Sequence, residues 1–315
     1  MTRRANHAVL WGLAAAAAAS AGVCVSLALS GCGAVEKTAD FLAGATAGTP
    51  ESDMLRGVAR AAESMKDYSP SQEHYIGRSV AAEILSRYKV HGDKALQEYV
   101  NLVGLAVLAA PEAAKTFSGY HFVVLEGQEV QAVSTPGGFV FLTEGAIRKA
   151  KDEDELASVL AHEIAHVTLK HGIQSIRAAT RKQSAALLAQ GAGGIASDAA
   201  SQGTAQQKQL ADLTRLFGGA IQDITTDLLV KGYSRQSEAD ADKLAAQILQ
   251  SSGYARGALA SYLGGLEHSS AGGKGGWLAT HPSPQERIAS LGELAQGSSP
   301  GEPIRRDRFR MRIPG

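Results

Sequence analysis

The pentapeptide His162-Glu163-Ile164-Ala165-His166 holds the residue types best suited to chemistry in this chain. Residues four apart share one face of an α-helix, so the two imidazoles can reach a single metal ion. Glu163 is turned by about 100° from His162 and can reach a water molecule on that ion. The spacing therefore predicts one Zn²⁺ per chain, with His162 and His166 as ligands and Glu163 as the catalytic general base.

A zinc hydrolase needs a third protein ligand, and one arrangement takes it from a histidine soon after the pentapeptide. Leu169 and Gly172 occupy the positions where that arrangement has glycine and histidine, so it is excluded. His171 follows His162 by nine residues, which places it on the opposite side of a continuing helix. We interpret His171 as a surface or packing histidine.

A second helix, expected over residues 234–250, supplies a different third ligand. Glu238 and Asp242 are four residues apart and face the same way. We expect Glu238 to bind the metal and Asp242 to accept a hydrogen bond from the far nitrogen of a ligating histidine, in the first place His162. This bond would fix the tautomer of the imidazole.

Several separated segments resemble one family. Glu238, Ala241 and Asp242 match its Glu-x-x-Ala-Asp motif, and residues 131–138 are similar to its Asn-Ala-Phe-Ala and Pro-Gly-Gly segments, with departures at Gln131 and Val133. The chain resembles the gluzincin metallopeptidase family that contains HtpX, the CAAX prenyl endopeptidases and the periplasmic lipoprotein proteases related to BepA and LoiP. The resemblance covers residues 71–294 and implies the catalytic domain alone, with a mostly helical α+β fold of the zincin type.

The resemblance also places His281 near the metal. This histidine lies in Thr280-His281-Pro282, after a run that contains Gly272 and three further glycines and is expected to form a movable loop. Two catalytic roles stay open for His281, an oxyanion donor and a fourth ligand that closes the site. A third alternative is a histidine that only begins the next turn.

A polypeptide substrate is expected to pair with an edge strand of the domain. The expected substrate strand comprises Gln131, Ala132, Val133 and Ser134. Backbone pairing gives affinity without demanding a sequence, so such a site favours extended or unfolded chains.

The chain outside these motifs predicts an α+β domain over residues 71–297. Apolar residues at helical spacing indicate two helices between residues 76 and 106, and short stretches rich in valine and phenylalanine at 121–125, 129–134 and 138–142 indicate a small antiparallel sheet. Residues beyond 143 are expected to be helical. Residues 173–232 are interpreted as a helical pair over the cleft, either as a substrate gate or as plain packing.

The first residues resemble an export signal that ends in a lipobox. Arg3 and Arg4 precede an apolar run, and Leu29-Ser30-Gly31-Cys32 has the small residues found before a lipidated cysteine. We therefore expect a lipoprotein signal peptide at 1–31, a lipid on Cys32 that anchors the chain to a membrane, and a flexible tether at 32–70. The alternatives are a membrane-spanning anchor and a chance cysteine. Gly33 favours the outer over the inner membrane, on the periplasmic face of the bacterial envelope.

The overall charge excludes one class of partner. The formal net charge is zero, so nothing indicates nucleic-acid binding. The arginines between Arg305 and Arg312 are the exception, and we interpret residues 298–315 as a basic, solvated and disordered tail. No feature of the sequence indicates an oligomeric state.

Together these features predict a zinc endopeptidase of the cell envelope that acts on unfolded or misassembled proteins of the outer membrane or periplasm. Two other functions are compatible with the sequence: a chaperone-like binding lipoprotein with a structural zinc, and a hydrolase of cell-wall peptides. Glu163 argues against the first, because a structural zinc has no use for a carboxylate beside an open position.

Overall fold

The computed structural model describes residues 67–190, 225–226, 229, 232–267 and 281–313. The chain divides into two compact units, one of which comprises Tyr68–Ile176 and Gly203–Gly315 and contains the expected catalytic domain except residues 177–202. Within the other unit, Arg177 forms an ion pair with Asp67 at 2.9 Å. The signal peptide, Cys32, the tether up to residue 66, the glycine-rich run before His281 and most of the expected helical cap lie outside the described residues.

The sheet has three short strands, β1 (His121–Leu125), β2 (Ala132–Thr135) and β3 (Phe139–Thr143), in the order β1-β3-β2. β2 and β3 are antiparallel and pair Ser134 with Val140, across a turn in which Gly137 has a positive φ of 76°. β1 is parallel to β3, so the sheet is mixed, and the prediction of a wholly antiparallel sheet is wrong in this respect. The 13 residues between β1 and β3 contain β2, which runs antiparallel to β3, so the chain reverses twice and β3 lies parallel to β1.

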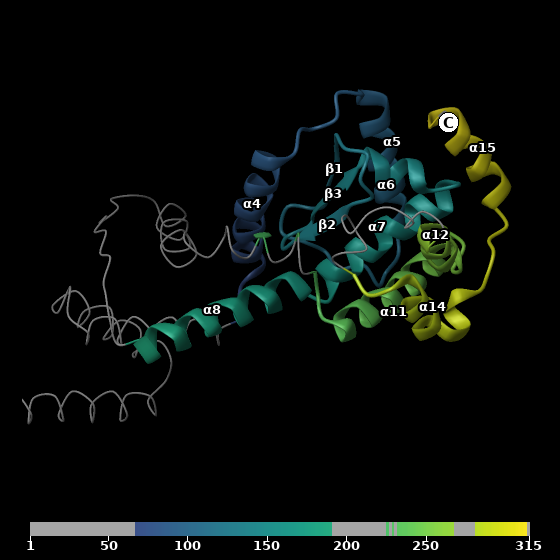
Figure 1. Ribbon diagram of the computed structural model, residues 1–315. Helices are drawn as coiled ribbons and strands as arrows, with labels where there is room; N and C mark the ends of the chain where they lie inside the picture. Colours follow the sequence, from purple (N-terminus) through teal and green to yellow (C-terminus); the bar gives the residue numbers. More distant parts are fainter. Residues whose placement is uncertain (1–66, 191–224, 227–228, 230–231, 268–280, 314–315) are drawn as a thin grey trace, which may run out of the picture. The chain divides into compact units, whose positions relative to one another are not determined.

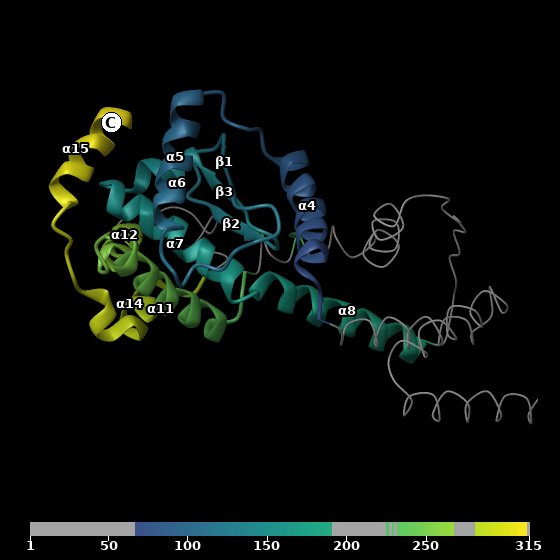
Figure 2. The same cartoon turned by 180° about the vertical axis from the view of Figure 1, so that it is seen from behind.

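Helix α7 (Glu153–Thr168) is the centre of the domain and carries the predicted metal-binding pentapeptide. Every residue from Glu153 to His166 is buried, because α7 packs against β2 and β3 as well as against α5, α11, α12 and α15. In Figures 1 and 2, α7 lies between the sheet and α11. Asp152 caps the helix by accepting from the Glu155 backbone N–H at 3.0 Å. The Glu155 carboxylate accepts from the backbone N–H of Lys151 at 2.9 Å.

Two of the described helices precede the sheet. α4 (Pro70–Arg87) begins with a complete capping box between Ser69 and Gln72, and α5 (Lys94–Val107) begins at Asp93, whose carboxylate accepts from two backbone N–H groups. α4 packs against β2 and β3, and α5 packs against β1 and α7. These helices satisfy the expectation drawn from the apolar spacing of this segment.

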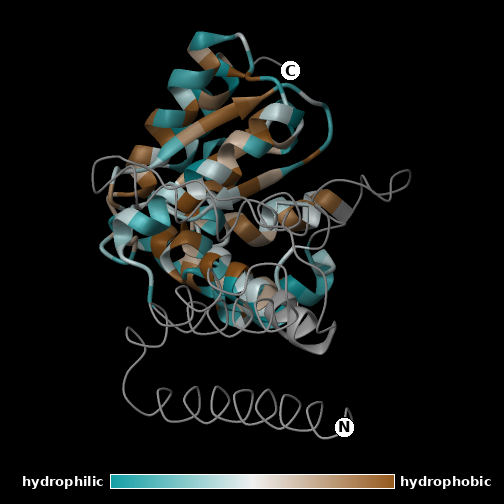
Figure 3. Cartoon of the chain, turned by 90° about the vertical axis from the view of Figure 1, so that its left-hand side faces the viewer, coloured by the Kyte–Doolittle hydropathy of each residue, from teal (hydrophilic) through white to brown (hydrophobic). Residues whose placement is uncertain are grey.

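The helices after the sheet complete the core. They are α6 (Glu144–Lys149), α8 (His171–Gln190), α11 (Arg235–Ser251), α12 (Ala258–Glu267), α14 (Pro284–Leu291) and the 3₁₀ helix η1 (Gly292–Ala295). The strands and the inner faces of the helices are the apolar parts of the chain in Figure 3. Among the described helices, none combines the length and apolar character that a bilayer crossing requires. The α+β class predicted from the sequence is confirmed.

The arginine-rich segment is ordered, contrary to the prediction of a solvated, disordered tail. Helix α15 (Glu302–Arg312) packs against α7 and α5. Arg305 donates two hydrogen bonds of 2.8 Å to Asp154, and Arg308 donates to both oxygens of Glu153, which is fully buried. The segment folds because the first turn of α7 presents buried carboxylates that need cationic partners.

Candidate metal centre

Four side chains from three parts of the chain meet at one buried point. His162 and His166 come from α7, Glu238 from α11, and His281 from the segment just before α14, and one ligand atom of each lies within 4.8 Å of all the others. The two Nε2 atoms of the histidines on α7 are 3.0 Å apart, and each lies 3.6 Å from an oxygen of Glu238. The residues predicted as metal ligands are therefore brought together by the fold.

His281 contacts Glu238 directly. Its Nδ1 atom lies 2.5 Å from Glu238 Oε2, and its ring centre lies 5.5 Å from that of His162. The side chain of His281 is 7% exposed, so this contact is enclosed. The structure thus places His281 in the cluster, rather than as a residue that only begins the next turn.

Asp242 and Arg287 lie behind His162. Asp242 Oδ1 is 2.9 Å from His162 Nδ1, the nitrogen that faces away from the cluster, as the spacing of Glu238 and Asp242 predicted. Arg287 on α14 donates to both oxygens of Asp242 at 2.6 and 2.9 Å. Arg287 is thus the partner of a buried carboxylate, and the pair ties α14 to α11.

His171 holds the corresponding place behind His166, which the sequence analysis missed. The two Nδ1 atoms are 2.9 Å apart, and His171 is 5% exposed. The error came from extending α7 past its end: the helix stops at Thr168, and Lys170, with a φ of 57°, turns the chain back into α8. No residue type around His171 signals this turn, because lysine rarely adopts a positive φ.

The protonation of the cluster follows from burial and from neighbouring charges. Burial and His162 hold the pKa of His166 well below its usual value, and burial lowers the pKa of His281 to about 4. Burial alone would raise the pKa of Glu238, but His281, His162 and His166 hold it far below the ordinary range. Burial and Arg287 act to lower the pKa of His162, but Asp242 and Glu238 outweigh them and raise it to about 9. The cluster therefore contains an ionised carboxylate beside neutral imidazoles at His166 and His281, whereas His162 holds its proton more strongly.

Glu163 lies on α7 beside the cluster and is 1% exposed. Burial raises its pKa, whereas His162 and the hydroxyl of Ser134 lower it. Ser134 belongs to β2, which forms one edge of the described sheet. All four residues of the expected substrate strand, Gln131 to Ser134, have buried side chains, so only backbone groups of this edge are suited to pairing with another strand.

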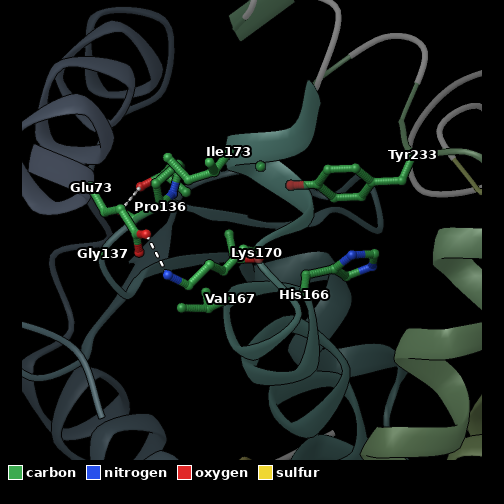
Figure 4. Close-up of a pocket in the computed structure, with 11 residues that line it drawn as sticks. Glu73, Pro136, Gly137, His166, Val167, Lys170, Ile173 and Tyr233 are labelled. Atoms are coloured by element: carbon green, nitrogen blue, oxygen red, sulfur yellow. Dashed lines mark hydrogen bonds and ion pairs between the residues drawn. The ribbon is translucent and has the colours of Figure 1, made fainter. Parts of the chain in front are cut away.

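A pocket adjoins the cluster on the side of His166 and is shown in Figure 4. The ring of Tyr233 stacks on His166 with centroids 4.3 Å apart, and Lys170 forms an ion pair with Glu73 at 2.7 Å across the pocket. Tyr233 directly precedes Ser234, the N-cap of α11, so its position is set by the helix that carries Glu238. The sequence analysis did not single out Tyr233.

The donor set fits a zinc ion. Two imidazoles and a carboxylate from two helices are the ligands that catalytic zinc sites use. Glu238 Oε1 is buried and makes no hydrogen bond to any described residue, which leaves an unsatisfied anionic oxygen inside the cluster. Both histidines of α7 have a partner for the nitrogen that faces away, as metal-ligating histidines do.

Comparison with known proteins agrees with this geometry. Residues 94–295 match the model of peptidase family M48. The chain is 30% identical over 237 residues to the beta-barrel assembly-enhancing protease of Escherichia coli (strain K12), which covers 74% of this chain and 45% of that protein. It is 29% identical over 231 residues to a putative beta-barrel assembly-enhancing protease of Vibrio cholerae, with 73% and 45% covered.

A eukaryotic relative matches as well. The mitochondrial metalloendopeptidase OMA1 of Schizosaccharomyces pombe is 29% identical over 234 residues, which covers 72% of this chain and 62% of that protein. The chain spans about half the length of the bacterial relatives that it matches. The resemblance predicted from the motifs is confirmed: the chain belongs to peptidase family M48.

Proposed function

We propose that this chain is a zinc-dependent endopeptidase in which His162, His166 and Glu238 hold the metal and Glu163 is the general base. The observation that carries the proposal is that the ligand atoms of these residues lie within 4.8 Å of one another at a buried site. The buried carboxylate of Glu163 follows His162 directly in the sequence. A structural zinc site closed by four protein ligands has no role for such a carboxylate.

The side chains divide the chemistry between them. Zinc at this site supplies a Lewis acid that lowers the pKa of a bound water molecule to about 7 and polarises the scissile carbonyl. Asp242 accepts from His162 Nδ1 and so keeps the lone pair of Nε2 free for the metal. Glu163 accepts a proton from the attacking water and passes it to the leaving amine.

His281 has two roles that fit its contact with Glu238. As a fourth ligand it closes the site, and as an oxyanion donor it stabilises the charge that develops on the carbonyl oxygen. The variant His281→Ala separates them. Loss of a closing ligand raises the rate of peptide cleavage, whereas loss of an oxyanion donor lowers kcat by about 10²–10³-fold.

We further propose that the substrates are unfolded or extended polypeptides that pair with the backbone of β2. The support is the position of β2 at the sheet edge and its packing against α7. Strand addition supplies affinity through main-chain hydrogen bonds and tolerates many side chains.

The proposed setting is the bacterial cell envelope, with the chain anchored through a lipid on Cys32. The residues 29–32 support the anchor, and the name of the Escherichia coli relative supports a role in outer-membrane protein assembly or its quality control. Cys32→Ser is expected to move the protein from the membrane fraction to the soluble periplasmic fraction. Retention of that variant in the membrane fraction would contradict the lipid anchor.

The test of the activity uses a soluble form that begins at Gly33 and an unfolded protein as substrate. Wild type, chelator-treated wild type and Glu163→Gln are compared at measured zinc occupancy. Only zinc-loaded wild type is expected to cut. Asp240→Asn is a matched control for Glu238→Gln, because Asp240 lies on the same helix and its carboxylate accepts a hydrogen bond from Gln236. Equal cutting by Glu163→Gln would refute the assigned base.

A further inference from the structure

Two buried oxygens beside the cluster have no hydrogen-bond partner among the described residues, Ser134 Oγ and Glu163 Oε1. Both residues are only 1% exposed. A buried hydroxyl or carboxylate oxygen without a partner is costly, and proteins rarely retain one without a reason. The pair therefore needs an explanation that packing does not give.

The fold brings the two side chains to the same place. Ser134 lies on β2, whose inner face packs against α7, the helix that carries Glu163. Ser134 also lines the pocket that contains His166. Its hydroxyl is close enough to act electrostatically on the Glu163 carboxylate.

Other hydroxyls in these strands are fully used, which sets Ser134 apart. Thr135 Oγ1 donates to Gly77 O at 3.1 Å, and Thr143 Oγ1 donates to Glu129 O at 2.5 Å and accepts from Gln131 N at 3.1 Å. Both threonine hydroxyls therefore satisfy backbone groups of neighbouring segments. The Ser134 hydroxyl has no hydrogen-bond partner among the described residues.

We propose that Ser134 is a positioning residue for the general base: its hydroxyl donates to Glu163 Oε1 and fixes the carboxylate so that the other oxygen faces the reacting water. Neither atom has a competing hydrogen-bond partner among the described residues, so both are available for this bond. The proposal rests on the proposed function of Glu163.

The kinetic test uses the zinc-loaded soluble form and the same unfolded protein as substrate. Ser134→Ala is expected to lower kcat about tenfold, with KM within twofold and zinc content unchanged, since misplacement of a reacting group costs rate rather than binding. Ser134→Cys keeps a side chain of similar size with a weak donor, so its kcat is expected to lie between those of wild type and Ser134→Ala. Ser79→Ala is the control, because it removes a partly buried hydroxyl that donates to Tyr75 O within α4 and belongs to neither the cluster nor β2.

A second measurement does not depend on activity. In chelator-treated protein, the unfolding midpoints of Ser134→Ala, Glu163→Gln and the double variant form a cycle, and the two shifts are expected to be non-additive. Additive shifts, an unchanged kcat in Ser134→Ala, or a change confined to KM would each overturn the proposal. If zinc-loaded wild type does not cut at all, the proposed function fails, while the cycle still decides whether the two side chains are bonded.

Discussion

The ion pair between Arg287 and Asp242 allows a sharp prediction, because both side chains are buried and joined by two hydrogen bonds of 2.6 and 2.9 Å. Arg287→Met keeps much of the side-chain volume but leaves a buried carboxylate without its cation. Removal of one partner of a buried pair costs about 3–5 kcal/mol. For a domain of this size, about 2–4 °C of Tm is lost per kcal/mol, so a decrease of about 6–20 °C is expected.

The assay is thermal unfolding of chelator-treated protein followed by circular dichroism. Arg235→Met is the control, because Arg235 pairs with Glu286 at 3.4 Å but the two side chains are 83% and 51% exposed. Such a surface pair contributes about 0–1 kcal/mol. Asp242→Asn added to Arg287→Met is expected to recover part of the loss, since it removes the unpaired charge. Equal shifts for Arg287→Met and Arg235→Met would refute the reasoning.

Three further predictions concern single residues. His171→Ala removes the partner of His166 Nδ1 and is expected to weaken zinc binding about 10–100-fold in a competition assay with a chromophoric chelator; unchanged affinity would contradict this role. Gly77→Ala places a Cβ 1.6 Å from the Pro136 carbonyl oxygen, so the backbone must shift and urea titration should show a loss of about 1–3 kcal/mol. Burial raises the pKa of Tyr120 to about 12, so the fold disfavours its ionised form and stability falls as the pH rises above about 10; Tyr120→Phe should unfold at a higher pH in an alkaline titration.

Local spacing carried the prediction of the ligand cluster. Two histidines four apart on a helix, and a glutamate and aspartate four apart on another, each fix a common face before any tertiary information is added. The positions of His162, His166, Glu238 and Asp242 in space follow once the two helices pack together.

Features that depend on where a helix stops were not predictable from periodicity. His171 reaches His166 only because Lys170 adopts a positive φ, a conformation that lysine rarely takes and that no motif announced. The parallel pairing of β1 with β3 was also not predicted, because the similar composition of the three strands does not indicate their order in the sheet.

The arginine-rich segment was misread for a different reason. A run of cations is usually solvated, and the sequence alone does not show that Glu153 and Asp154 are buried at the start of α7. Because Glu153 and Asp154 are buried, they need cationic partners, and arginines of this segment pack against them instead of remaining in solvent.

The contact between Arg308 and Glu153 bears on the order in which the domain folds. Arg308 lies 155 residues after Glu153, so the helix that carries the candidate ligands lacks this cationic partner until the chain has been synthesised as far as α15. Chains are made from the N-terminus, and contacts between distant residues form late. In a domain built in this order, the packing around the candidate metal centre is completed only near the end of synthesis.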